Sequence, residues 1–88
     1  MATVTKVTVR PSMQLRVAGV SMGLMAVKPD AQDPEAVLGL SNPDKGVPEQ
    51  HRVRPGDHFE VAGRHFEVIG ITPDPGRVEL LVSWEEPA

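Results

Sequence analysis

The sequence predicts an all-β fold, either a small barrel or a two-sheet sandwich of about six antiparallel strands. Three observations support this prediction. The run TVTKVTVR near the N-terminus is rich in β-branched residues, turn-forming Pro and Gly pairs recur in the C-terminal half, and the last apolar run alternates with polar residues. The chain has 88 residues, so residues 1–88 are expected to form one small domain.

The N-terminal third contains two regions expected to form strands. Residues 3–10 end at Pro11, which indicates a strand near the edge of a sheet. Residues 14–27 (QLRVAGVSMGLMAV) alternate between apolar and polar positions, but the alternation changes phase near Gly19. This region forms either one long strand bent at a bulge or a hairpin with a tight turn, and both alternatives stay open.

Residues 28–50 contain four prolines and can hold only short elements. Asp33, Pro34 and Glu35 are typical of a helix start, but the glycine and proline that follow would end such a helix early. The alternative is a short strand over residues 36–40, followed by a loop. We favour the strand because the C-terminal strands need partners, while the helix over residues 33–41 remains an alternative.

Turns are clearer in the C-terminal half. Pro55-Gly56 suits a type II turn, because Pro restricts φ at the first central position and Gly accepts the positive φ of the second. A second turn is expected over residues 72–76 (TPDPG), and the alternating run after it has one apolar face. Residues 53–84 are therefore expected to form a three-stranded meander that curves at Gly70.

The tetrapeptide HFEV occurs twice within residues 57–68 (DHFEVAGRHFEV), and a β-hairpin explains the duplication. An even loop length places Phe59 opposite Phe66. Both Phe and both Val side chains then share a buried face, and the His and Glu side chains share the other face. A four-residue loop over residues 61–64 is favoured over a two-residue loop, because Ala62 is a poor residue for a primed turn.

The polar face of this hairpin has a second interpretation as a metal site. Imidazole and carboxylate groups are ligands for zinc and other divalent cations, and here they are supplied by His58, Glu60, His65 and Glu67. His51 extends the seven-residue spacing, but Pro55 and Gly56 exclude a helix that would align the three histidines. We expect exposed acid–imidazole pairs and keep the metal site as the alternative.

No set of residues predicts catalysis or a cofactor. The chain has no Cys, which excludes disulfides and thiolate chemistry. Residues 19–23 match the G-x-S-x-G pattern around Ser21, but the residues that follow cannot form the helix of a nucleophile elbow. The glycines are spread through expected hairpins, so no phosphate-binding loop is predicted. We expect a protein that is not an enzyme and binds no cofactor.

Charge and hydropathy indicate which classes of partner are not expected. The net charge is −3, and basic residues do not form a stripe with interleaved aromatic residues, so binding to nucleic acid is not expected. The N-terminus lacks the pattern of a signal peptide, and no apolar stretch approaches the roughly 20 residues that cross a bilayer. We therefore expect a cytoplasmic protein without membrane contact.

The pattern V-R-P-G-D-x-F-x-V-x-G-R-x-F-x-V over residues 53–68 resembles the C-terminal part of small all-β proteins from high-GC bacteria. The resemblance extends to Val82 and covers about a third of the chain. The abundance of Val, Gly, Pro and Asp, with more Arg than Lys, agrees with such a bacterial source. Those proteins have no assigned activity, so the resemblance implies no functional residue.

Two functions from different classes fit these observations. The first is a non-catalytic module that binds another protein or forms a homo-oligomer such as a homodimer, because no catalytic set is present and exposed strand edges are expected. The second is a small-ligand or divalent-metal-binding domain that uses the His and Glu face of the hairpin.

Overall fold

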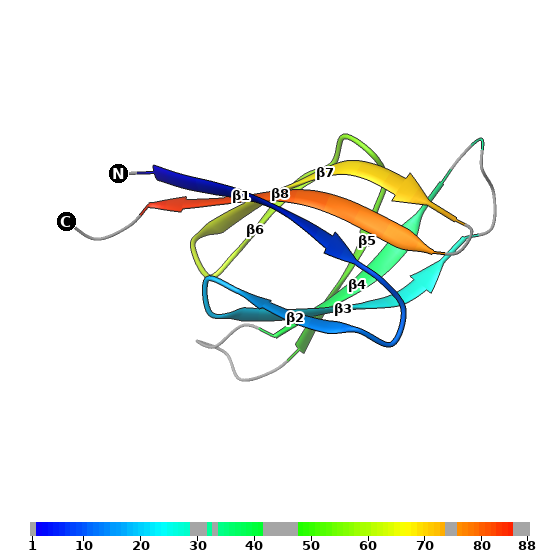
Figure 1. The fold of residues 1–88 in the computed structure, drawn as a ribbon, viewed down its shortest axis with the longest axis horizontal. Coiled ribbons are helices and arrows are strands. Elements are labelled where there is room, and N and C mark those ends of the chain that lie inside the picture. Colours follow the sequence, from blue (N-terminus) through cyan, green and yellow to red (C-terminus); the bar gives the residue numbers. More distant parts are fainter. Residues whose placement is uncertain (1, 29–31, 33, 42–47, 74–75, 86–88) are drawn as a thin grey trace.

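The chain folds as two antiparallel four-stranded sheets that pack face to face (Figure 1). The computed structural model describes residues 2–28, 32, 34–41, 48–73 and 76–85. The all-β prediction is confirmed in its sandwich form, because the described strands do not close into a barrel. The described residues form eight strands instead of about six, since residues 14–27 contain two strands and residues 48–53 add one more.

The first sheet, called sheet A, combines the N-terminal strand with the last three strands. In spatial order its strands are β1 (Ala2–Val9), β8 (Arg77–Glu85), β7 (Arg64–Thr72) and β6 (His58–Val61). The predicted meander is confirmed for β6, β7 and β8. The register of β7 and β8 shifts between Val68 and Gly70, which places a bulge at the predicted point of curvature. As predicted, β1 is an edge strand.

The second sheet, called sheet B, follows chain order. Its strands are β2 (Gln14–Val17), β3 (Val20–Val27), β4 (Ala36–Ser41) and β5 (Pro48–Val53). Residues 14–27 form a hairpin, and the two turn residues Ala18 and Gly19 have φ angles of 51° and 84°. The favoured strand over residues 36–40 is confirmed as β4. Asp33, the expected cap of the alternative helix, lies outside the described residues.

Two connections carry the chain between the sheets. After β1, Pro11 forms a parallel bridge with β3 before β2 begins. After β5, the predicted Pro55-Gly56 turn is present, since Asp57 N donates to Arg54 O at 3.1 Å and Gly56 has a φ of 92°. Gly56 N also donates to a carbonyl of β7 at 2.7 Å, so the turn is anchored on sheet A.

The core lies between the sheets and is mostly aliphatic. Every second residue of β4 and of β8 points into it, as the alternation in the last strand predicts. Phe66 is its largest fully buried side chain. The other buried apolar residues are Val9, Val20, Met22, Ala36, Leu38, Leu40, Val53, Val61, Val68, Val78, Leu80 and Val82.

Candidate interaction surfaces

The repeated HFEV forms the predicted hairpin. Phe59 lies opposite Phe66, and each His lies opposite a Glu on the outer face of sheet A. The loop has two residues, so the prediction of a four-residue loop is wrong. Val61 and Arg64 remain paired, while Ala62 and Gly63 have φ angles of 51° and 77°. A positive φ is unfavourable for the backbone of Ala62, but the two-residue turn adds one more cross-strand pair to the hairpin.

The two histidines of the hairpin lie against each other. His58 Nδ1 is 3.0 Å from His65 Nε2, a hydrogen-bond distance at which one of the two nitrogens donates. Glu60 Oε1 is 3.7 Å from His65 Nδ1, and Glu67 lies opposite His58 in the register. Within the described parts of the chain, no group of three or more His, Cys, Asp or Glu is placed to hold a metal ion.

His51 lies on β5 of sheet B, and its side chain points toward sheet A. The side chains of His58 and His65 instead lie on the outer face of sheet A. Its ring stacks on Phe59 with a centroid distance of 4.7 Å, and Phe59 stacks on Phe66 at 5.0 Å. The three rings therefore connect β5 to β6 and β7 along one side of the sandwich. His51 Nε2 is buried and has no hydrogen-bond partner in this structure. The seven-residue spacing of the histidines thus does not bring all three together.

The outer face of sheet B has a shallow hollow with a glycine floor. Gly23 and Gly39 lie opposite each other on β3 and β4, and they line the hollow together with Met13 and Met25. The Met25 Sδ atom would be 3.0 Å from a Cβ added at Gly39, so the thioether lies directly over the glycine. Both methionines are exposed, whereas Met22 is buried in the core.

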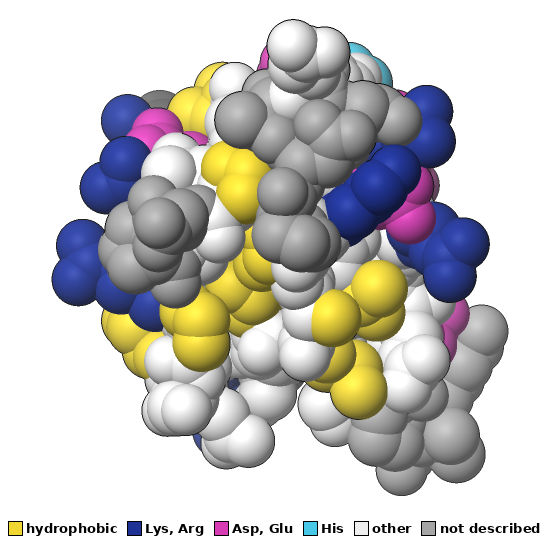
Figure 2. All heavy atoms as spheres, turned by 90° about the vertical axis from the view of Figure 1, so that its right-hand side faces the viewer, with side chains coloured by type: hydrophobic (Ala, Val, Ile, Leu, Met, Phe, Trp, Pro, Cys, Tyr) yellow, Lys and Arg dark blue, Asp and Glu magenta, His cyan; other side chains and the backbone are white. Residues whose placement is uncertain are grey.

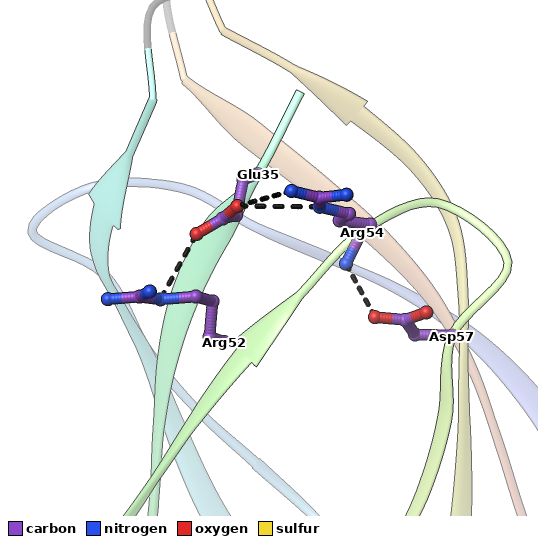
Figure 3. Close-up of polar contacts among 4 residues, drawn as sticks. All are labelled: Glu35, Arg52, Arg54 and Asp57. Carbon is purple, nitrogen blue, oxygen red and sulfur yellow. Dashed lines mark hydrogen bonds and ion pairs between the residues drawn. The ribbon is translucent and has the colours of Figure 1, made fainter. Parts of the chain in front are cut away.

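Charged side chains flank apolar ones at the end of the sandwich where β7 turns into β8. Figure 2 shows this end, with hydrophobic side chains in the middle of the face and Lys and Arg side chains on both sides. A defined network of charged side chains surrounds Glu35, just before β4. Glu35 Oε1 is 3.1 Å from Arg52 Nε, and Oε2 is 3.2 Å from Arg54 Nη2 (Figure 3).

The Glu35 network connects the start of β4 to the end of β5. Arg54 N also donates to Asp57 Oδ2 at 2.9 Å, which fixes the turn that leads to sheet A (Figure 3). The side chain of Glu35 is only 17% exposed, while those of Arg52 and Arg54 are largely exposed. The two guanidinium groups are thus bound to a carboxylate of the same chain, and these ion pairs connect the two segments.

Among the described strands, β1 has the longest edge that pairs with no other strand. β1 has eight residues, whereas the other edge strands β5, β2 and β6 have six, four and four. β1 contains no Pro, and its one charged residue is Lys6. Lys6 Nζ lies 3.3 Å from Glu79 Oε2 on the neighbouring β8, so the charge is held toward its own sheet. Val4, two residues earlier on the same face, is 62% exposed.

Several of these features were not predicted from the sequence. The glycine-floored hollow depends on the pairing of β3 with β4, and the Glu35 network depends on the pairing of β4 with β5. Ser21, in contrast, lies within β3 opposite Ser41, in extended backbone that does not form a nucleophile elbow.

Comparison with known proteins found no similar chain. No family model matches the sequence, and neither a curated protein nor a solved structure matches it. The resemblance of residues 53–68 to small all-β bacterial proteins therefore stays a prediction. Among the described residues, no helix is long and apolar enough to span a membrane.

Proposed function

We propose that this chain is a non-catalytic interaction module that binds another protein or a second copy of itself. The observation that carries the proposal is the free edge of β1. Such an edge presents unpaired backbone N–H and C=O groups at alternate residues and is a ready template for another strand. The exposed Val4 beside this edge offers apolar area that a partner would cover.

The other edges are less suited to a partner strand. β2 and β6 have four residues each and both adjoin tight turns, so they offer few backbone groups. β5 begins at Pro48, which lacks an N–H, and it carries Glu49 and Arg52. Natural proteins use short length, Pro and charge to protect sheet edges from unwanted pairing. β1 has the weakest protection of the four.

Sedimentation velocity of the purified chain and capture of partners from its native lysate test this proposal. We expect either self-association or a captured protein, and we expect the interaction to weaken when Val4 is replaced by Lys. The exposed Val4→Lys variant should keep its circular dichroism spectrum and its melting temperature. A strict monomer that captures no partner in a Val4-dependent way would refute the proposal.

A second candidate function is the binding of a divalent transition-metal ion by His58 and His65. The observation that favours it is the 3.0 Å separation of the two imidazole nitrogens. Two metal–nitrogen bonds of about 2.1 Å to such nitrogens would enclose an angle of about 90°, which suits the geometry of Ni²⁺ or Cu²⁺. Glu60, near the other nitrogen of His65, would orient that ring.

Calorimetric titration with Ni²⁺ tests this second candidate. Binding should be lost in His58→Gln and in His65→Gln, and the metal should raise the melting temperature of the unmodified chain alone. Glu67→Gln, which changes the same face without removing a nitrogen ligand, is the matched control. Equal binding by the unmodified chain and by both histidine variants would exclude this site.

A further inference from the structure

We propose that the partner of the β1 edge is a second copy of this chain, which pairs antiparallel with the first about a two-fold axis at Thr5. This inference rests on the proposed function and names its partner. The two copies of sheet A would then form one continuous eight-stranded sheet with β1 next to β1 at its centre. β1 lies at the end of the strand order of sheet A, and β8 is its described neighbour in the sheet (Figure 1).

The faces of the two copies match in this register. Residues 3, 5, 7 and 9 of β1 are paired with the core-facing residues of β8, and residues 2, 4, 6 and 8 form the outer face. Pairing about Thr5 places residue 4 opposite residue 6 and residue 3 opposite residue 7 of the second copy. Inner residues therefore meet inner residues along the whole contact, as a continuous sheet requires.

Among the symmetric registers that match faces, those about Thr5 and Lys6 pair the most residues of β1, namely 2–8 and 3–9, and charge decides between these two. An axis at Lys6 would place the two Lys6 side chains directly opposite each other, which is unfavourable for like charges. With the axis at Thr5, Lys6 lies opposite Val4 of the second copy, and its ammonium group can keep its contact with Glu79 at 3.3 Å. Lys6 therefore distinguishes between the two longest symmetric pairings of this edge.

The same register covers the apolar groups left at the free edge. Val4 is 62% exposed, and the methylene stem of Lys6 from the second copy would lie against it. On the inner face, Thr3 lies opposite Trp84 within one copy, and Trp84 is only partly buried. Val7 of the second copy would lie beside Thr3 and extend the apolar surface around this indole.

Opposite charges placed at Val4 test the pairing of Val4 with Lys6. Val4→Lys would put two like-charged pairs into the symmetric dimer, so we expect its dissociation constant to rise at least about tenfold at low ionic strength. Val4→Glu would place a carboxylate opposite each Lys6, and the dimer should stay as tight or become tighter. Sedimentation equilibrium gives both constants, and the melting temperatures report whether the two variants fold equally well.

A cysteine scan provides a second measurement that does not depend on affinity. The chain has no Cys, so a single introduced thiol can form a disulfide only with the same residue of a second copy. Two Thr5→Cys residues on the axis would have Cα atoms about 5 Å apart, within disulfide range. Two Thr3→Cys residues would be separated by roughly 13 Å along the strands and should not cross-link. We expect a covalent dimer from the first variant alone under mild oxidation.

Each other outcome overturns a defined part of the inference. If both charge variants weaken the dimer equally, or Thr3→Cys cross-links as well as Thr5→Cys, the register about Thr5 is wrong. If both variants leave the dimer intact and Thr5→Cys does not cross-link, the dimer uses another surface. If the chain stays monomeric but binds a different protein in a Val4-dependent way, the second copy is excluded and the proposed function is retained.

Discussion

The two phenylalanines of the hairpin should contribute very differently to stability, although their sequence contexts are the same. Phe66 is fully buried between the sheets, while Phe59 is half-buried and covered by His51. Phe66→Ala removes a whole aromatic ring from the core and should cost about 3–5 kcal/mol of unfolding free energy. Phe59→Ala removes a ring that already contacts solvent, so its cost should be roughly half of that.

These costs are large for a chain of this length. A domain of 88 residues has an unfolding free energy of about 4–13 kcal/mol, so Phe66→Ala would consume much of it. Each 1 kcal/mol corresponds to about 4–8 °C in melting temperature, and Phe66→Ala should lower this temperature by at least about 12 °C. Phe66→Leu keeps most of the buried volume and provides a milder variant if the alanine variant does not fold.

Urea unfolding followed by circular dichroism gives the two free energies at 25 °C. Met25→Ala, which truncates a side chain that is 57% exposed, is the control and should stay within about 0.5 kcal/mol of the unmodified chain. The reasoning fails if Phe59→Ala is the more damaging variant. That result would mean that the stack with His51, rather than burial between the sheets, dominates the stability of the hairpin.

Three further predictions test local geometry. Ala62→Asn should raise the unfolding free energy by about 0.5–1 kcal/mol in urea titrations, because Asn accepts the φ of 51° better than Ala; no gain would contradict the turn geometry. Gly76→Ala should melt at a lower temperature than Gly56→Ala. Both glycines have positive φ, but only an added Cβ at Gly76 would lie 3.1 Å from Pro11 Cγ, so equal melting temperatures would exclude this close contact. Glu35→Gln should lower the unfolding free energy by less than about 1 kcal/mol at low salt and by almost nothing in about 1 M NaCl, because the arginine partners of Glu35 are exposed. A loss of unfolding free energy that does not depend on salt would contradict this reasoning.

The hairpin could be predicted because residues close together in the sequence determine its strand pairing. Period-two alternation and the duplicated HFEV specify which residues face each other, so the pairing of Phe59 with Phe66 follows from a few neighbouring residues. The Pro55-Gly56 turn was predicted for the same reason, since the φ preferences of two residues determine it. The loop length was mispredicted because Ala62 alone disfavours a primed turn, whereas the pairing of Val61 with Arg64 favours it.

Sheet order was not predicted, because it depends on contacts between distant parts of the chain. β1 pairs with β8, so Ala2 lies opposite Glu85, and no local pattern identifies that partner. No partner strand could be predicted for residues 48–53, which belong to sheet B and pair with β4. An alternating strand can be placed in either sheet without changing its own pattern, so the two-sheet arrangement is decided by packing of the whole core.

The proposed site has the same dependence on long-range structure. The side chains of β1 are those of an ordinary half-buried strand, and nothing in TVTKVTVR distinguishes an edge strand with an open side from a central one except the following Pro11. The proposed binding surface exists only because β8 pairs with one side of β1 and the chain then crosses to sheet B, so that no described strand pairs with the other side. Backbone groups, which are the same in every residue except proline, form this surface. Specificity must therefore come from the few side chains beside it, and Val4 and Lys6 are the positions at which the pairing can be changed by charge.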